Sequence, residues 1–242
     1  MPFRTDLGQN IFRQKYASNA YETWEDRANT VVNSVCGDMD GQKNNLMAKD
    51  DRDQLARYIQ EFKFMPGGRY LWYSGRNARF FNNCYLLRLE DDSREEWAGV
   101  TQRAMSCLMT GGGIGVDVSL CRPSGRQLRR TGGIASGPIP LLYTLNEVGR
   151  NVMQGGSRRS ALYGSLNWHD MRLGKQQEYS VADMKKFNFN YPAPLDMMNV
   201  SLNYDDAWLK NGVSEIFREN CKQAMMTGEP GFSFNFGEKE NE

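Results

Sequence analysis

The chain has 242 residues, of which 30 are Lys or Arg and 29 are Asp or Glu, with one His and a formal net charge of +1. With 40% hydrophobic and 24% charged residues, the composition predicts a folded protein of one or two domains and argues against disorder, collagen and a simple coiled coil. The near-zero charge gives no electrostatic reason to expect a nucleic-acid partner, although local groups can still hold a nucleotide. No apolar stretch reaches the roughly 20 residues that span a bilayer. Because the N-terminus also lacks a signal-peptide pattern, we expect a cytoplasmic protein with no membrane partner.

The N-terminal part of the chain has a helical pattern. Capped segments are predicted from residue 6 or 10 towards residue 24, from 23 to 35 and from 50 to 62, with a break at 37–41. The run Met-Pro-Gly-Gly-Arg at 65–69 should end the helical pattern, because Pro and paired Gly do not continue a helix. We expect a helical region over residues 1–75.

From residue 82 onward, apolar strands alternate with helices. Strands are predicted at 84–89, 114–120, 161–168, 199–203 and 231–236, and helices at 94–109, 138–152 and 213–226, with a short helix starting at 180. Five strands separated by helical connections imply βαβ units and a mostly parallel sheet. We expect an α/β domain over residues 76–242.

Two glycine-rich runs could be structural or could hold a ligand. The run at 111–115 follows a helix and precedes a strand, the reverse of a dinucleotide-binding loop, so helix termination and close packing are its simpler interpretation. Its alternative role is to let a ligand approach the backbone closely. The run at 154–161 combines Gly, Arg and Gln, which can contact a base or phosphate or can form a solvated loop. The pattern does not decide between these two.

The five cysteines are Cys36, Cys84, Cys107, Cys121 and Cys221, an odd number without a Cys-x-x-Cys pair. A zinc site or a disulfide framework is therefore not expected, and most of the thiols should be small buried groups. Cys84, at the head of a strand beside two Asn residues, is either redox-active or inert packing. Asp91 and Asp92 could bind ribose hydroxyls or form a turn. The one histidine, His169, is most simply part of a loop, and no metal site is expected.

Short motifs follow one another in order along the chain. They are Met-Pro-Gly-Gly-Arg at 65–69, Asn-Cys-Tyr at 83–85, Glu-Asp-Asp-Ser at 90–93, Gly-Ile-Gly-Val-Asp at 113–117, Thr-Gly-Gly at 131–133, Ala-Ser-Gly-Pro at 135–138, Asn-Glu-Val-Gly-Arg at 146–150, Met-Gln-Gly-Gly at 153–156, Arg-Arg-Ser-Ala at 158–161, Asn-Val-Ser-Leu at 199–202 and Gly-Glu-Pro-Gly at 228–231. Together they resemble the N-terminal half of the catalytic chain of ribonucleotide reductases, especially the adenosylcobalamin-dependent (class II) type. The resemblance implies helices followed by a five-stranded parallel half-barrel, the first half of a ten-stranded α/β barrel.

The resemblance also implies a reaction and its partners. Ribonucleotides would be reduced at the 2′ carbon by a thiyl radical, generated with adenosylcobalamin as cofactor. A cysteine pair would supply the electrons and be recycled by a thioredoxin-type reductant. A dNTP or ATP effector would regulate the choice of ribonucleotide substrate. The resemblance leaves open di- or triphosphate substrates, and a monomer or a homodimer.

Site residues are implied by the same motifs. Cys84 is similar to the first member of the redox pair. The implied substrate-binding residues are Asn83, Gly112, Gly113, Gly67 and Gly68. The loop between effector and substrate is implied to contain Gln154, Gly155, Gly156, Arg158 and Arg159, and the effector's ribose and phosphates are implied to lie at Asp91 or Asp92 and at Arg122.

The family's Asn-x-Cys-x-Glu motif, which holds the thiyl cysteine, is absent from the 242 residues, as are motifs for the second redox cysteine and the shuttle cysteines. We therefore expect a reductase fragment that needs a C-terminal half for activity, as a split-gene product, an intein-divided exon or a truncated form. The alternatives are a non-catalytic nucleotide-binding module derived from the same family and a fragment of a class I (iron-dependent) large chain.

Overall fold

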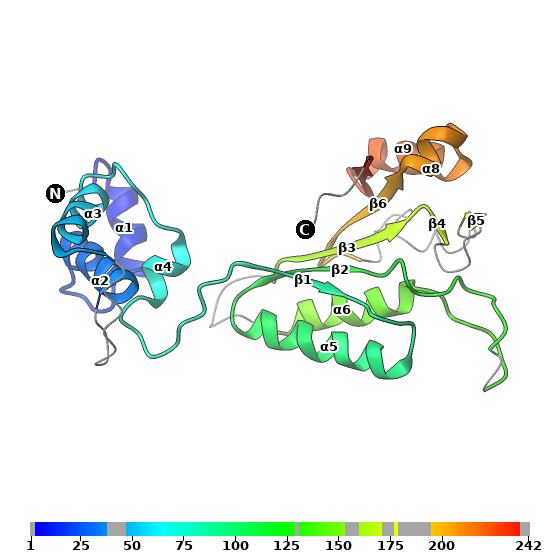
Figure 1. Cartoon of the computed structure of the whole chain (residues 1–242), viewed down its shortest axis with the longest axis horizontal. Coiled ribbons are helices and arrows are strands. Elements are labelled where there is room, and N and C mark those ends of the chain that lie inside the picture. Colours follow the sequence, from blue (N-terminus) through cyan, green and yellow to red (C-terminus); the bar gives the residue numbers. More distant parts are fainter. Residues whose placement is uncertain are drawn as a thin grey trace. The chain divides into compact units, whose positions relative to one another are not determined.

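The structure is a computed structural model, and it describes residues 3–37, 47–128, 131–152, 160–170, 177–178 and 195–237. The chain separates into two compact units, Met1–Asn82 and Asn83–Glu242, each with its own hydrophobic core (Figure 1). The boundary expected from the sequence lies between residues 75 and 76. Among the described residues, every helix is too short or too polar to cross a membrane.

The first unit is helical and contains α1 (Asp6–Lys15), α2 (Trp24–Cys36), α3 (Lys49–Gln60) and α4 (Gly68–Tyr73). Helices α1 and α2 begin after Thr5 and Thr23, whose hydroxyl oxygens accept hydrogen bonds from backbone N–H groups of the first turn. The apolar faces of the helices meet in one core, formed by Phe12, Trp24, Ala28, Val31, Val32, Ala56, Ile59 and Leu71.

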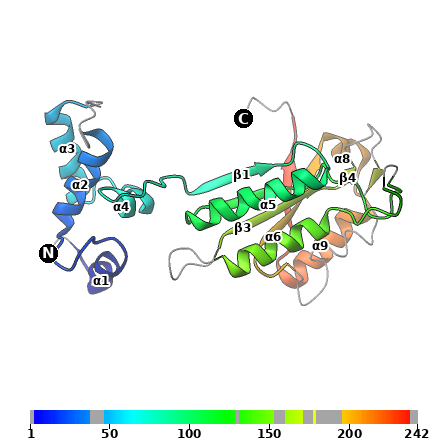
Figure 2. The same ribbon diagram turned by 90° about the horizontal axis from the view of Figure 1, so that it is seen from below.

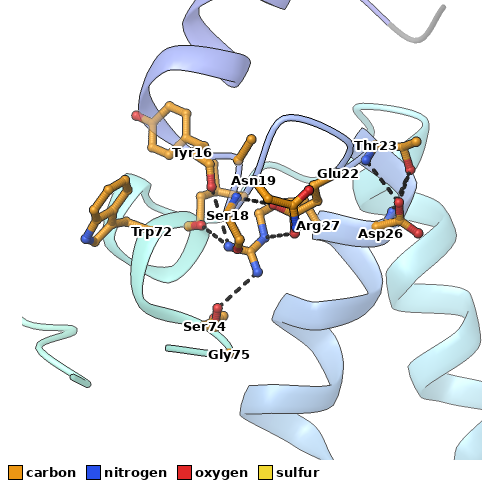
Figure 3. A network of polar contacts seen from close by, with 12 residues as sticks. Tyr16, Ser18, Asn19, Glu22, Thr23, Asp26, Arg27, Trp72, Ser74 and Gly75 are labelled. Carbon is orange, nitrogen blue, oxygen red and sulfur yellow. Dashed lines mark hydrogen bonds and ion pairs between the residues drawn. The ribbon is translucent and has the colours of Figure 1, made fainter. Parts of the chain in front are cut away.

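A buried arginine connects two of these helices. Arg27 of α2 is 1% exposed, and its Nε lies 3.2 Å from Oε1 of Glu22. Its guanidinium also donates to the carbonyl oxygens of Leu71 (3.1 Å) and Ser74 (3.0 Å), at α4 and its end (Figure 3). Desolvation lowers the pKa of Arg27, and the carboxylate of Glu22 opposes this change. The arginine therefore holds α4 against α2 through the backbone of α4.

The second unit is built on a five-stranded sheet of β1 (Cys84–Arg88), β2 (Gly113–Asp117), β3 (Leu162–Asn167), β6 (Asn199–Asp205) and β7 (Gly231–Asn235). The strands are all parallel and lie in the order β1-β2-β3-β6-β7, so each strand pairs with the next main strand along the chain. A short antiparallel pair, β4 (His169–Asp170) and β5 (Gln177–Glu178), follows β3.

Helices cover one face of this sheet. The connections contain α5 (Arg94–Met109), α6 (Ile139–Asn151), α8 (Asp206–Asn211) and α9 (Glu215–Thr227). Figure 2 shows α5 and α6 side by side over the strands, and Ile216 of α9 belongs to the same core. Alternate strand residues point towards these helices and form the core, which includes Ile114, Val116, Leu162, Leu166, Val200, Leu202 and Tyr204.

The opposite face of the sheet has a different composition. By the strand registers, its positions include Cys84 and Leu86 on β1, Gly113, Gly115 and Asp117 on β2, Tyr163, Ser165 and Asn167 on β3, Asn199, Ser201 and Asn203 on β6, and Gly231 and Ser233 on β7. At its centre, Asp117 Oδ2 accepts hydrogen bonds from Ser165 Oγ (2.5 Å) and Asn203 Nδ2 (2.9 Å). Small and polar side chains thus form a surface that no described helix covers, which we call the open face.

Three expectations from the sequence were wrong in detail. The helical pattern does not end at residue 69, because α4 begins at Gly68 and buries Leu71 in the core. The first helix stops at Tyr16, before a turn in which Asn19 Oδ1 accepts a hydrogen bond from Tyr21 N. Among the five thiols, only Cys121 is buried. The short helix predicted to start at residue 180 lies outside the described residues.

Candidate functional site

The head of the sheet places Cys84 in an exposed position on the open face. Cys84 is the first residue of β1, and its register partner on β2 is Gly113. The next position across the sheet is Ala161, whose carbonyl oxygen accepts a hydrogen bond from Ile114 N (2.9 Å). The thiol therefore has a glycine and an alanine as its neighbours across the strands, which leaves space above the backbone.

The adjacent glycines Gly112 and Gly113 have different surroundings. A Cβ on Gly112 would lie 2.3 Å from Cε2 of the Tyr85 ring, so Gly112 is required by packing on the helix-covered side. A Cβ on Gly113 would lie 3.2 Å from the Cβ of Ala161, on the open face. Gly113 lines the groove described below, and Gly112 is buried outside it.

A groove of about 500 Å³ crosses the open face at the amino ends of the strands. Its floor extends from Cys84 across β2 and β3 to the segment before β6. The groove is lined by Cys84, Gly113, Ile114, Gly115, Ser160, Ala161, Leu162, Tyr163, Asp196, Met197, Met198 and Asn199. A thiol, small residues, one aromatic ring and amide and carboxylate groups thus converge in one concave surface, a combination typical of small-molecule sites.

Asn83 contributes to this site through its backbone. Its carbonyl oxygen accepts a hydrogen bond from Gly113 N at 2.8 Å, which starts the pairing of β1 with β2. Its side chain is exposed beside Cys84. Asn83 therefore lies next to the thiol at the head of β1, and its substrate-binding role stays a prediction.

A second cleft lies where β1 and β2 lead into their loops. Arg122 donates through Nε and through its backbone N–H (3.1 Å) to Oδ2 of Asp92, and through Nη2 to the Asp92 carbonyl oxygen (3.1 Å). Asp91 accepts a hydrogen bond from Ser93 N (3.0 Å), in the turn that precedes α5. Asp92 and Arg122 line the cleft together with Arg94, Trp97, Arg126 and Gln127. Of the two aspartates, Asp92 is the one that contacts Arg122.

The remaining predicted site residues belong to the helical unit or lie outside the described residues. Gly67 is the N-cap of α4, and Gly68 is its first residue, in the helical unit. A Cβ on Gly68 would lie 3.1 Å from the hydroxyl oxygen of Tyr16, so this glycine allows α4 to approach Tyr16 closely. Gln154, Gly155, Gly156, Arg158 and Arg159 lie outside the described residues.

Two polar clusters near the sheet were missed from the sequence. At the amino ends of the strands, Asn146 and Arg150 of α6 bind Asp196, beside the groove. At the carboxyl ends, Asp205 accepts hydrogen bonds from the Trp168 indole (2.9 Å) and lies 2.9 Å from Nε2 of His169, which is 5% exposed. His169 is therefore a buried, paired side chain. In the sequence, a polar residue at an apolar position of a helix, such as Asn146, could have indicated the first cluster.

The described residues contain no cluster of three or more His, Cys, Asp or Glu that could hold a metal ion. Burial raises the pKa of Cys107, which disfavours its thiolate. Among the described thiols, Cys84 is the exposed one.

Comparison with known proteins finds a family model that matches part of this chain. Residues 82–175 match the family model described as ribonucleotide reductase, barrel domain. The predicted resemblance to ribonucleotide reductases is confirmed. The match covers the strands β1 to β3 and therefore both Cys84 and the Asp92–Arg122 pair.

Individual relatives come from two types of reductase. The chain is 27% identical over 203 residues to the vitamin B12-dependent ribonucleoside-diphosphate reductase of Mycobacterium tuberculosis, covering 75% of this chain and 28% of the relative. It is 35% identical over 116 residues to the ribonucleoside-diphosphate reductase large subunit of Danio rerio, covering 46% of this chain and 14% of the relative. The chain thus spans less than a third of the length of these curated relatives.

A solved structure shares the fold. The Actinobacillus ureae class Id ribonucleotide reductase alpha subunit aligns with a TM-score of 0.73 at 15% identity, covering 95% of this chain and 40% of that chain. The expected fold, helices followed by a five-stranded parallel half-barrel, is confirmed.

Proposed function

We propose that this chain supplies the substrate-binding and effector-binding surface of a ribonucleotide reductase, with Cys84 as one of its two redox thiols. The observation that carries this proposal is the exposed position of Cys84 on the open face, beside the side-chain-free Gly113. A ribose seated in the groove over Gly113 would lie next to the thiol. The relatives named above are ribonucleoside-diphosphate reductases, which favours a diphosphate substrate.

In the proposed reaction, the C–O bond at the 2′ carbon breaks and a C–H bond forms. The 2′ hydroxyl leaves as water. Cys84 and a second cysteine give up two electrons and two protons in total and form a disulfide, which a thioredoxin-type reductant returns to two thiols. Exposure of Cys84 fits both steps, because the thiol must contact the nucleotide and then another sulfur.

Adenosylcobalamin is the proposed radical source, since the Mycobacterium relatives are vitamin B12-dependent. When bound, it would supply the radical that starts the reaction. The described residues carry no feature that identifies a cobalamin site, so no step is assigned to this chain through the cofactor.

Activity would also require a polypeptide segment with the thiyl cysteine. The 242 residues contain no Asn-x-Cys-x-Glu motif. The open face, with its polar Asp117, Ser165 and Asn203, is where such a segment and the substrate would meet. We therefore propose that the chain acts together with a C-terminal half of the reductase.

The cleft at Asp92 and Arg122 is the proposed effector site. Arg122 and Arg126 offer guanidinium groups for phosphates, and Asp92 offers a carboxylate that can accept hydrogen bonds from ribose hydroxyls. The segment 153–159, which follows α6, is the proposed connection between this effector and the substrate base, with Gln154 and Arg158 as its readers.

The decisive experiment is substitution of Cys84 in the reductase that contains this chain. Cys84→Ser should abolish turnover with a thioredoxin-type reductant and leave nucleotide binding unchanged. Cys221→Ser, on α9, is the matched control and should keep turnover. Full turnover by the Cys84→Ser enzyme would refute the role of Cys84 and would favour a non-catalytic nucleotide-binding module.

The class I (iron-dependent) type is the second candidate. It is favoured by the 35% identity to the large subunit of Danio rerio. Turnover requires adenosylcobalamin in class II enzymes, whereas in class I enzymes it requires a metal-bearing small subunit. Dependence of turnover on one or the other, measured with purified components, decides between them.

A further inference from the structure

The last turns of α6 carry a polar cluster that fastens the wall of the groove to this helix. It consists of Asn146, Arg150 and Asp196, and we call it the clasp. Asp196 Oδ1 accepts hydrogen bonds from Asn146 Nδ2 (3.1 Å) and from Arg150 Nη2 (2.5 Å). Asn146 and Arg150 are four residues apart and therefore project from the same side of the helix. One carboxylate oxygen thus receives both side chains.

Asn146 binds the segment before β6 through both polar atoms of its side chain. It is 1% exposed, and the other buried residues of this helix are the apolar Ile139, Leu141, Leu142, Leu145 and Gly149. A buried amide is costly unless both its donor and its acceptor are paired. Here the Oδ1 of Asn146 accepts a hydrogen bond from Met197 N (2.9 Å), and its Nδ2 donates to Asp196. Both groups belong to the segment before β6, so the amide fixes the position of that segment on α6.

The same segment forms one wall of the groove. Asp196, Met197, Met198 and Asn199 all line it, whereas Leu195 is 1% exposed and anchors the segment in the core. The hydrogen bonds of Asp196 to Arg150 and to Asn146 lower its pKa, which keeps the acceptor charged at neutral pH. A displacement of the last turn of α6 would therefore move the wall that faces Cys84 across the groove.

α6 also touches the groove floor through β3. Between the two helical residues of the clasp lies Gly149, where a Cβ would be only 2.0 Å from Cδ1 of Leu162. Leu162 lines the groove beside Ala161. At the end of the helix, Ser160 Oγ donates to the Val152 carbonyl oxygen (3.0 Å), which joins the residues flanking segment 153–159. The end of α6 is thus in contact with β3 and with the segment that leads into β6.

We infer that Asn146, Arg150 and Asp196 are positioning residues that transmit movement of the last turn of α6 to the substrate groove, so that an effector changes substrate preference through them. This inference rests on the proposed function. The residues neither react nor need to touch the nucleotide base. They set where Met197 and Asn199 stand relative to Cys84.

The test uses the reductase that contains this chain, assayed with two different effector nucleotides. The quantity measured is the ratio of the substrate KM values under the two effectors. Arg150→Met and, separately, Asp196→Asn should bring this ratio at least about fivefold closer to one, the lower end of typical allosteric coupling. For Arg150→Met, whose side chain is not part of the groove lining, kcat at saturating substrate and the affinity for each effector should stay within about twofold of the wild type. Glu147→Gln is the matched control, because it removes only the other partner of Arg150.

Restoration by a conservative change separates positioning from general stability. Arg150→Lys keeps a donor for Asp196 and should recover part of the effector response. A change in helix stability alone would affect Arg150→Lys and Arg150→Met to a similar extent. An unchanged KM ratio in both Arg150→Met and Asp196→Asn would overturn the inference while leaving the proposed function intact. A wild-type enzyme without any effector response would overturn the proposed effector function and the inference with it.

Discussion

Three glycines near the start of β2 meet different neighbours, which makes their substitution informative. Gly112 faces the Tyr85 ring, Gly113 faces Ala161 across the open face, and Gly115 has only ordinary contacts, the nearest being Tyr163 at 3.4 Å from an added Cβ. The sequence run alone could not distinguish these roles, because all three are glycines in the same motif. The strand alternation decides which side each one faces.

Gly112→Ala should lower the free energy of unfolding by about 1–3 kcal/mol, because overpacking against Tyr85 forces the ring or the backbone to shift. Gly115→Ala is the control and should change it by less than about 0.5 kcal/mol. Urea denaturation of the two variants and of the wild type measures both effects. Equal losses in the two variants would contradict the packing explanation for Gly112.

Cys84 should react with a soluble thiol reagent in the native chain, whereas Cys121, which is fully buried, should react only after unfolding. Peptide mapping by mass spectrometry after a short exposure identifies the modified thiols. Cys84→Ser should remove the fast-reacting fraction. Protection of Cys84 in the native chain would contradict its exposed position and weaken the redox proposal.

The structure brings several motif residues together, while the roles inferred for them stay predictions. Cys84, Asn83 and Gly113 lie at the head of the sheet, and Asp92 contacts Arg122. Asn146 and Asp196 were not paired, because they lie on separate elements and the intervening residues give no local pattern for the contact. Buried polar contacts between distant segments depend on the packing of elements, which propensity and spacing do not specify.

At the scale of elements, Asp205 connects the carboxyl end of β6 to α8 and to the residues that follow β3. It caps α8 by accepting a hydrogen bond from Trp208 N (3.0 Å) and also binds Trp168 and His169. Burial raises the pKa of Asp205, but these hydrogen bonds outweigh it and hold the pKa below its ordinary value of 3.8. A carboxylate with a lowered pKa stabilises the folded state above its unfolded pKa.

The stabilisation from Asp205 should therefore be lost as the pH falls through the lowered pKa. Asp205→Asn should reduce stability by about 1 kcal/mol at neutral pH, because the amide can still cap α8 but loses the charge that strengthens the hydrogen bonds with Trp168 and His169. The difference in thermal midpoint between wild type and Asp205→Asn should shrink as the pH falls below about 4. A difference that grows at acid pH would contradict the assignment.

In the helical unit, substitution of Arg27 should also lower the free energy of unfolding. Arg27→Lys keeps the charge beside Glu22 but loses the planar group that reaches both Leu71 and Ser74 (Figure 3). We expect a loss of about 1–3 kcal/mol in unfolding free energy, because buried carbonyl groups lose their donor. Arg57→Lys, on the exposed side of α3, is the control and should be close to neutral. Equal effects of both substitutions, measured by thermal unfolding, would refute the prediction.

At the scale of the whole molecule, the order of the sheet was accessible from the sequence because each main strand pairs with the next one. Alternation of strands and helices predicted the parallel sheet, and the main strands begin or end within a few residues of the expected positions. α4, α8 and the β4–β5 pair were missed. They are short, with two to six residues each, and their patterns are too brief to distinguish from loops.

A sheet with one apolar and one polar face also limits how the gene can change. Loss of the Gly113 codon would shift the rest of β2 by one position, turning Ile114 and Val116 to the open face and Gly115 towards α5. Loss of two codons would keep the sides but displace them along the strand. Natural variants of this chain should therefore differ in length between the strands, and rarely inside β2.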